Sequence, residues 1–322
     1  MVTSPKASIT VLGAGVSGLT TAICLAESGH RVRVRAALPP DRTTSACAGA
    51  SWGPYMVSDA RVLDWSIATL REFERLPEGR GVRFVRGMEA SPDDEVKPPE
   101  WVTAMRDYRL CDRDALPEGY ALGWWFTIPL VDMPVYLRHL TERLAALGVG
   151  IEVLPRPLAA FAELDDPGIL INCTGLGSRL LVEDSGLEAT RGQLVVVEDP
   201  GLDWFFQDDR EEGELTYFLP HGRHVVLGGY AEPYHGDPAE LRPDPEIARR
   251  IVERCAAIEP RLAGAVKIED RVGLRPNRKS GIRIEAELVD GVTVIHNYGH
   301  AGSGVTLSWG CAQEVSRLVR EL

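Results

Sequence analysis

The sequence predicts an α/β unit combined with an α+β region in one chain, and three patterns indicate this. Residues 9–12 read as a buried strand that runs into a Gly-rich turn, and helical spacing of apolar residues follows over residues 16–26. Residues 31–35 alternate with period two, as in a strand. Residues 190–295 contain several strand-like segments with little helix between them. We therefore expect a Rossmann-type nucleotide-binding domain and a second domain with a mostly antiparallel sheet.

The composition fits a two-lobed globular protein and excludes several classes. The chain has 322 residues, of which 44% are hydrophobic and 25% charged, and its net charge is −12. This length buries enough surface to fold without disulfides or a structural metal, and the acidic charge gives little basis for nucleic-acid binding. Six scattered cysteines without metal or redox spacing indicate reduced thiols in a cytoplasmic protein. Gly123, Pro129, Asp132 and Pro134 interrupt the most apolar stretch, so no membrane span is expected.

The first unit is bounded by residues that end or start its elements. Apolar residues of the predicted helix share one face, namely Val16, Leu19, Ala22, Ile23 and Ala26. Gly29 is placed to end this helix in a left-handed conformation. The strand at 31–35 follows at once, so the order is strand, helix, strand with glycines at the first turn.

A second helix is delimited by Asp132 as N-cap, Pro134 in its first turn and Gly148 after its end. Strands are expected at residues 151–154 and 169–172, and then at 194–197, 215–219, 225–227, 282–288 and 292–295. A last helix is expected over residues 304–322, directly after a Gly-rich segment. Residues 89–100, which are rich in Pro and Asp, are expected to form a solvated loop.

The Gly-rich turn carries a dinucleotide-binding fingerprint. Gly13 would make the tight turn, Gly15 would let a pyrophosphate approach the backbone, and Gly18 would let helix and strand pack closely. The unpaired amides of the helix N-terminus then face the phosphates. The acidic residue expected at the end of the second strand is missing, and Arg35 stands there instead, which favours a phosphorylated ribose. At this point FAD and NADP are both open.

Several segments together resemble the D-amino-acid oxidase family, in the form of a bacterial-type member. The most specific are Arg271-Val272-Gly273-Leu274-Arg275-Pro276 and the run at 294–311, which contains His296-Asn297-Tyr298-Gly299-His300. Segments at 43–55, 171–175 and 191–193 also match, in the expected order. The resemblance covers nearly the whole chain.

The resemblance implies non-covalently bound FAD and oxidative deamination of neutral D-amino acids. A hydride passes from the substrate α-carbon to the flavin, the imino acid hydrolyses to a 2-oxo acid and ammonia, and dioxygen is reduced to hydrogen peroxide. The FAD-binding domain would be discontinuous and comprise residues 1–55, 130–188 and 290–322. Residues 56–129 and 189–289 would form the substrate and interface domain. Because FAD lacks a ribose phosphate, Arg35 need not indicate NADP.

The resemblance also implies a substrate site. A carboxylate is best held by a planar guanidinium that makes two parallel hydrogen bonds, and Arg275 matches the carboxylate-binding arginine of the family. Tyr217 matches a tyrosine whose hydroxyl adds a bond to that carboxylate, and Gly302 matches the glycine whose carbonyl meets the amine. No side chain need act as a base, because alignment of the α-hydrogen with the flavin supplies much of the catalysis. The last helix would direct the positive end of its dipole at the reduced flavin.

Cofactor contacts carry over to a larger set. These residues are Gly13, Ala14, Gly15, Val16, Ser17, Gly18, Thr43, Thr44, Gly49, Ala50, Ser51, Leu158, Thr174, Arg275, Gly302, Ser303, Gly304, Val305 and Thr306. Structural interpretations stand beside these: Thr43 and Thr44 also suit turn chemistry, and Tyr217 also suits packing in a core.

The sequence departs from the family at several positions. Gly213 stands where mammalian members carry a second active-site tyrosine, and Gly53 replaces a glutamine. Tyr230 lies one residue from the second tyrosine of the yeast enzymes, so it is a further pocket candidate. The short acidic stretch at 208–214 argues against a large hydrophobic lid. His300 is expected to make a structural hydrogen bond, and the aromatic residues at 124–126 are expected to pack in the core or at an interface.

Other functions stay open on the sequence alone. D-Aspartate oxidase and glycine oxidase share the frame, although a D-aspartate pocket would need a second cation that the sequence does not identify. A protein that binds FAD without turnover and an NADP-dependent dehydrogenase are further alternatives. The expected partners are a small D-amino acid and dioxygen, and a homodimer is allowed. The sequence leaves the preferred D-amino acid and the behaviour of any lid open.

Overall fold

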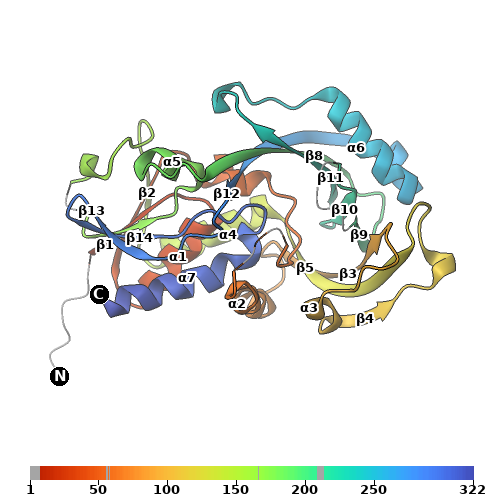
Figure 1. Cartoon of the computed structure of the whole chain (residues 1–322), viewed down its shortest axis with the longest axis horizontal. Helices are drawn as coiled ribbons and strands as arrows, with labels where there is room; N and C mark the ends of the chain where they lie inside the picture. Colours follow the sequence, from red (N-terminus) through yellow and green to blue (C-terminus); the bar gives the residue numbers. More distant parts are fainter. Residues whose placement is uncertain (1–7, 56, 58, 166, 209–213) are drawn as a thin grey trace.

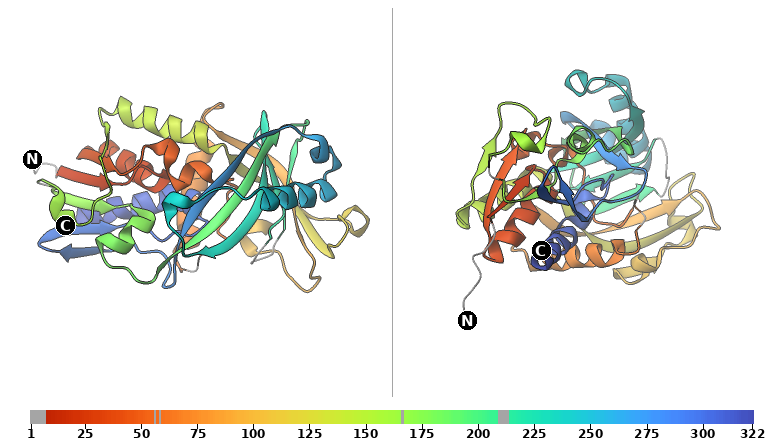
Figure 2. Two further views of the ribbon diagram at one scale, coloured as in Figure 1. Left: turned by 90° about the horizontal axis from the view of Figure 1, so that it is seen from above. Right: turned by 60° about the vertical axis from the view of Figure 1, so that its left-hand side comes forward.

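The computed structural model describes residues 8–55, 57, 59–165, 167–208 and 214–322. Within these residues the fold combines two sheets that lie toward opposite ends of the long axis (Figures 1 and 2). The prediction of a Rossmann-type unit and a second, sheet-rich region is confirmed.

The first sheet has six strands in the order β13-β14-β7-β1-β2-β6. Its strands are β1 (Ser8–Leu12), β2 (Arg31–Ala36), β6 (Ile151–Val153), β7 (Ile169–Asn172), β13 (Ala286–Val289) and β14 (Val292–His296). All neighbours are parallel except β13 and β14. Because β14 pairs with β7 and β7 with β1, the two ends of the chain build one sheet beside the Gly-rich turn.

Four helices support this sheet and the turns at its edge. They are α1 (Val16–Glu27), α2 (Val62–Arg75), α4 (Met133–Ala146) and α7 (Gly304–Glu321). α7 packs against both α1 and α2. The α2 contact is close, because a Cβ atom added at Gly310 would lie 2.2 Å from the Cα of Trp65. The hydroxyl of Thr20 in α1 donates to the carbonyl of Ser308 in α7 at 3.1 Å, so the first and last helices are held in fixed register.

The second sheet has eight strands in the order β12-β8-β11-β10-β9-β3-β5-β4. They are β3 (Val82–Ser91), β4 (Arg106–Leu110), β5 (Leu122–Val131), β8 (Leu187–Glu198), β9 (Trp204–Asp208), β10 (Tyr217–Pro220), β11 (His224–Tyr234) and β12 (Lys267–Arg278). Only the β3–β9 pair is parallel, so the expected antiparallel sheet is confirmed.

Two local expectations are wrong. Residues 190–295 contain a full helix, α6 (Pro245–Ile258), which begins at an Asp244 N-cap that accepts hydrogen bonds from the amides of Glu246 and Ile247. The buried face of α6 packs on the second sheet. The solvated loop expected at 89–100 begins only after Ser91, because β3 extends to that residue and Glu89 is 2% exposed. The short helices α3 (Glu100–Thr103) and α5 (Ser178–Leu181) complete the elements.

The predicted domain bounds do not coincide everywhere with the division into two sheets. β13 falls inside the stretch 189–289 yet pairs with β14 in the first sheet. β8 and β12 run along each other from the centre of the molecule. None of the described helices has the length and apolar character needed to cross a membrane.

Candidate active site

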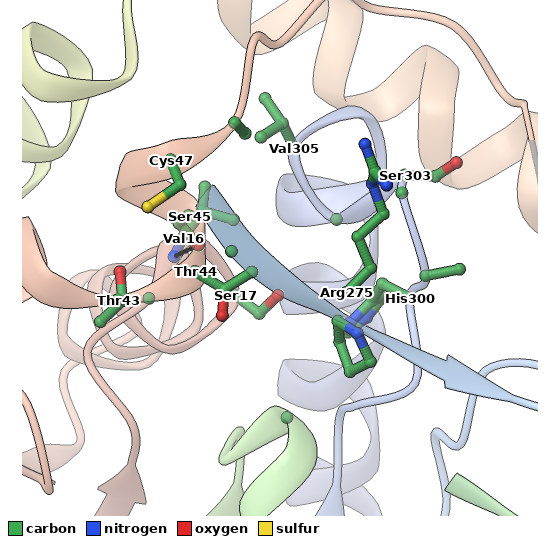
Figure 3. Close-up of a pocket in the computed structure, with 18 of the residues that line it drawn as sticks. Val16, Ser17, Thr43, Thr44, Ser45, Cys47, Arg275, His300, Ser303 and Val305 are labelled. Atoms are coloured by element: carbon green, nitrogen blue, oxygen red, sulfur yellow. Dashed lines mark hydrogen bonds between the residues drawn. The ribbon is translucent and has the colours of Figure 1, made fainter. Parts of the chain in front are cut away.

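A cavity of about 1170 Å³ runs from the carboxyl ends of β1 and β2 to the face of the second sheet. It exceeds the roughly 300–1,000 Å³ that is typical of small-molecule pockets. Segments from both sheets line it, and Figure 3 shows the β1–α1 turn on one side and Arg275 with the loop before α7 on the other. The cavity therefore suits a long ligand with a second, smaller molecule beside one end.

The glycines of the fingerprint have the geometry that the sequence predicts. Gly13 adopts φ +108°, and a Cβ atom there would lie 2.4 Å from the carbonyl oxygen of Cys173. A Cβ at Gly18 would lie 2.0 Å from the carbonyl oxygen of Gly13. Gly18 thus allows α1 to approach the turn, but it does not line the cavity, so its place among direct cofactor contacts needs correction. Gly15 is the N-cap of α1 and lines the cavity.

Ser45 was not among the predicted site residues, although it stands in a segment that matches the family. It lies in the 3-10 turn Thr44–Cys47, and its Oγ accepts a hydrogen bond of 3.0 Å from the backbone amide of Val16. The hydroxyl thereby fixes this turn against the N-terminus of α1 (Figure 3). This role in positioning the turn is visible only from the contact with Val16, which lies 29 residues earlier in the chain.

We expect Ser45→Ala to weaken FAD binding by about fivefold, because one net hydrogen bond that orders the phosphate-binding turn is lost. Titration of the apoprotein with FAD, followed by flavin fluorescence, measures the change. Ser316→Ala is the matched control, because the buried Ser316 hydroxyl has no hydrogen-bond partner among the described residues. An unchanged dissociation constant for Ser45→Ala would contradict the assigned role.

Arg35 lies at the end of the cavity where a nucleotide ribose is expected. Its guanidinium donates to both carboxylate oxygens of Glu152 on β6, at 2.8 and 3.1 Å. This bidentate pairing occupies two of the donors that a ribose phosphate would need. The structure therefore favours an unphosphorylated ribose.

The other predicted contacts at this end line the cavity, but the threonine hydroxyls among them donate hydrogen bonds to protein oxygen atoms. The hydroxyl of Thr43 donates to the carbonyl of Pro40 at 2.8 Å, and that of Thr44 donates to the carbonyl of Leu274 at 3.2 Å. The hydroxyl of Thr174 donates to Asn172 at 2.7 Å. Leu158 also lines the cavity. The turn chemistry considered for the threonines is thus observed beside their position in the lining.

The middle of the cavity is formed by Gly49, Ala50 and Ser51 and by the loop that precedes α7. This loop contributes Gly302 and Ser303 to the lining, and the first turn of α7 contributes Gly304, Val305 and Thr306. The amide of Gly53 donates to the hydroxyl oxygen of Thr306 at 3.1 Å, and the hydroxyl of Ser303 donates to the carbonyl of Tyr55. These hydrogen bonds hold residues 53–55 against the N-terminus of α7, whose positive dipole end faces the cavity.

Arg275 and Tyr217 come from different strands, both line the cavity, and the positive charge of Arg275 acts on the Tyr217 hydroxyl. The guanidinium of Arg275 lies over Gly192 on the neighbouring strand, where an added Cβ would be 2.7 Å from Nη1. No described residue accepts a hydrogen bond from this buried Nη1. The ring of Tyr217 lies over Gly228 in the same way, because a Cβ there would be 2.0 Å from Cζ. Burial raises the pKa of Tyr217 to about 12, so its hydroxyl stays a donor.

A polar cluster beside this pair was not predicted. Glu89 Oε2 accepts hydrogen bonds from the Tyr55 hydroxyl at 2.5 Å and from the amide nitrogen of Gln207. The same Gln207 nitrogen donates to the Tyr55 oxygen at 2.7 Å. All three residues line the cavity. Burial and the negative charge of Glu89 raise the pKa of Tyr55 well above its ordinary value.

The remaining candidates have mixed outcomes. His300 lines the cavity and its Nε2 donates to Asn297 at 3.0 Å, as the expected structural bond requires; burial lowers its pKa to about 4. Tyr230 is not in the cavity lining and instead donates to Glu232 at 2.9 Å. Trp124 belongs both to the core and to the lining. Gly213 lies outside the described residues.

The lining fits FAD. The fingerprint turn leaves room for a pyrophosphate, and the start of α7 offers a helix N-terminus to a ring that gains negative charge. Arg275 Nη1, which has no partner among the described residues, offers a donor to a carboxylate. The arrangement can bind a long dinucleotide together with a small anion.

Comparisons with known proteins agree with this geometry. The model of the family described as FAD dependent oxidoreductase matches residues 8–318. A D-amino-acid oxidase of Streptomyces coelicolor is 45% identical and covers 96% of each chain, and one of Rubrobacter xylanophilus is 42% identical, covering 96% of this chain and 94% of its own. A D-aspartate oxidase of Homo sapiens is 35% identical over 98% of this chain and 95% of its own. The solved glycine oxidase of Bacillus cereus has the same fold, with a TM-score of 0.79 at 19% identity over 98% of this chain and 95% of that one.

Proposed function

Because this chain belongs to the family of FAD-dependent oxidoreductases, we propose that it is a D-amino-acid oxidase. The observation that carries the proposal is the Arg275 guanidinium, whose buried Nη1 has no hydrogen-bond partner among the described residues, in a cavity that Tyr217 also lines and that is large enough for FAD. The reaction converts a D-amino acid, water and dioxygen into a 2-oxo acid, ammonia and hydrogen peroxide. FAD would be held by the fingerprint turn and by the residues before and at the start of α7, and it would supply the acceptor for the hydride of the substrate α-carbon and the two electrons for dioxygen.

The substrate carboxylate is bound by Arg275 and Tyr217. A guanidinium donates two parallel hydrogen bonds to a carboxylate, and the desolvated setting strengthens them. Arg275 packs over Gly192 and Tyr217 packs over Gly228. Both side chains are therefore positioned before the substrate binds, so little side-chain entropy is lost on binding. The tyrosine hydroxyl contributes a donor throughout the physiological pH range, because its pKa is raised to about 12.

The amine and the α-hydrogen are placed by the backbone. We assign the carbonyl of Gly302 as the acceptor for the amine, next to the start of α7. Two anchors at the carboxylate and one at the amine orient the α-carbon, and such orientation supplies several kcal/mol of the barrier. His300, the histidine in the described lining, is held neutral by burial and is bonded to Asn297, so it serves structure.

We assign FAD to the lobe formed by residues 1–55, 130–188 and 290–322, and the substrate face to residues 56–129 and 189–289, except that β13 belongs with the FAD lobe because it pairs with β14 in the first sheet. The cofactor contacts are the cavity-lining residues of the predicted set, with Gly18 in a supporting position. A cytoplasmic location is part of the proposal, and six free cysteines support it. A homodimer stays a prediction, and light scattering of the holoenzyme measures it directly.

A peroxide-coupled screen of the purified protein tests the function. We expect flavin absorbance in the protein as isolated, peroxide from several neutral D-amino acids, and none from their L-enantiomers. D-Aspartate and glycine belong in the same screen, because the D-aspartate oxidase relative shares 35% identity. Bound FAD without peroxide from any D-amino acid would overturn the proposal in favour of a binding protein.

A further inference from the structure

Tyr217 lies against a bulge in the neighbouring strand. Strand register places Tyr217 of β10 opposite Gly228 of β11, and a Cβ atom added at Gly229 would lie 2.9 Å from Cε1 of the tyrosine ring. The register of β11 with β8 shifts between Leu227 and Tyr230, so both glycines belong to a bulge. The position of the Tyr217 ring therefore depends on the backbone of these two glycines.

Arg254 of α6 binds the backbone on both sides of this contact. Its Nη2 donates to the carbonyl of Gly229 at 3.0 Å and to the carbonyl of Leu215, two residues before Tyr217, at 3.2 Å. The Leu215 carbonyl also accepts a hydrogen bond from the amide of Gly229 at 2.6 Å. One guanidinium nitrogen thus joins the segment that leads into β10 to the bulge of β11.

An ion pair fixes the guanidinium in this place. Arg254 Nη1 lies 2.9 Å from Oε2 of Glu214, and Arg250 Nε lies 3.2 Å from the other carboxylate oxygen. The Arg254 side chain is 19% exposed, so water and salt screen this pair only in part. Cys255, the next residue of α6, is buried, and its Sγ donates to the carbonyl of Tyr217 at 3.3 Å. The second half of α6 therefore holds the start of β10 and the bulge as one unit.

α6 reaches the tyrosine from the face of the sheet that is opposite the cavity. Side chains alternate along β10, so Phe218 packs with the apolar residues of α6 whereas Tyr217 lines the cavity. Arg254 is absent from the cavity lining. It can therefore influence a ligand in the cavity only through the segment that carries Tyr217.

We propose that Arg254 is a positioning residue of the oxidase: from α6 it holds Tyr217 where the tyrosine hydroxyl can donate to the substrate carboxylate. This inference rests on the proposed function, because it takes Tyr217 as an anchor of that carboxylate. Without the guanidinium, the bulge and the start of β10 are no longer joined, and the hydroxyl is held less firmly in the binding position. Since this hydrogen bond is made to the bound substrate and to the transition state alike, its loss raises KM and leaves kcat largely unchanged.

The test uses propionate, which has the carboxylate of alanine without its amine, as a competitive inhibitor of the FAD-loaded enzyme. Arg254→Met keeps an apolar stem and removes the donors, and we expect it to raise the inhibition constant of propionate about fivefold. KM for a neutral D-amino acid should rise by a similar factor, while kcat stays within about twofold of the wild type.

A double-mutant cycle with Tyr217→Phe separates positioning from a general structural role. Tyr217→Phe alone is expected to raise the inhibition constant about tenfold, because it removes a hydrogen bond to a charged group. In the Tyr217→Phe background, Arg254→Met should raise the constant less than about twofold further, because the hydroxyl that Arg254 positions is absent.

Arg249→Met is the matched control. Arg249 lies on the same helix, is exposed, and pairs with Glu246 and Glu253 of α6 itself, so the inhibition constant should not change. FAD content shows whether each variant has folded. If Arg254→Met does not retain FAD, Arg254→Lys takes its place in the cycle, because it keeps the charge beside Glu214. We expect Arg254→Lys to raise the constant about threefold in the wild type and not in Tyr217→Phe.

The inference is overturned if Arg254→Met leaves the inhibition constant within twofold of the wild type, or if its effect is equal in the two backgrounds. It is also overturned if neither Arg254 variant retains FAD, because the residue is then required for the fold. An unchanged constant in Tyr217→Phe would contradict the tyrosine anchor and the inference with it. Failure of the proposed function looks different: the wild type then yields no peroxide from any neutral D-amino acid, and the inference falls with the function that it serves.

Discussion

Arg275→Ala is expected to lower kcat/KM for neutral D-amino acids by about 10²- to 10⁴-fold while FAD stays bound. The loss corresponds to one desolvated, bidentate, charge-assisted contact with the substrate carboxylate, which is typically worth about 2–5 kcal/mol. The other cofactor contacts of the lining are unchanged by this substitution, so the cofactor should be retained. Arg275→Lys keeps the charge but loses the planar fork, and we expect an intermediate activity.

Steady-state peroxide assays and flavin absorbance on the same preparations measure both effects. Arg271→Ala is the matched control, because Arg271 lies on the same strand, pairs with Glu269 at 2.7 Å and is absent from the cavity lining. If Arg275→Ala kept kcat/KM within threefold of the wild type, the carboxylate would bind elsewhere and the proposed orientation of the substrate would be wrong.

Gly18→Ala is expected to abolish stable FAD binding and to lower the free energy of unfolding by about 3 kcal/mol. The new methyl group would lie 2.0 Å from the carbonyl oxygen of Gly13, which is backbone and cannot rotate away. Relief requires α1 to move off the turn, and overpacking of this kind costs about 1–3 kcal/mol or more. The same movement displaces the helix N-terminus from the pyrophosphate site.

Urea unfolding of the apoprotein and FAD titration give the two quantities separately. Gly150→Ala serves as the control, because a Cβ atom there meets nothing within 4 Å. An FAD affinity of Gly18→Ala equal to that of the wild type would show that the close approach of α1 to the turn is dispensable.

The sequence carries the parts of the fold that local patterns encode. The strand, turn and helix around Gly13 and Gly15 follow from hydrophobic period and glycine spacing, and the structure confirms them. α6 was missed although the signal was present: Asp244 precedes Pro245, and Ile247, Ile251 and Cys255 repeat at a spacing of four. The abundance of strands around this stretch concealed a helix that its own residues indicate.

The polar wall of the cavity could not be found in this way. Glu89 looked like part of a Pro- and Asp-rich solvated segment, and only the parallel pairing of β3 with β9 brings it opposite Gln207, 118 residues later. Ser45 depends likewise on a contact with α1. The roles of such residues depend on sheet register and on contacts between turns that are distant in the chain. A single sequence does not contain this information.

The pairing of β14 with β7, and of α7 with α1, also sets an order of events during biosynthesis. The fingerprint turn is made early, whereas the strand that borders β7 and the helix that packs on α1 are made only as translation passes residues 292–321. The lining residues Gly302–Thr306 are made in the same stretch. Cofactor capture therefore follows translation of β14 and α7, and a nascent chain arrested before β14 would present the dinucleotide fingerprint without the ability to retain FAD.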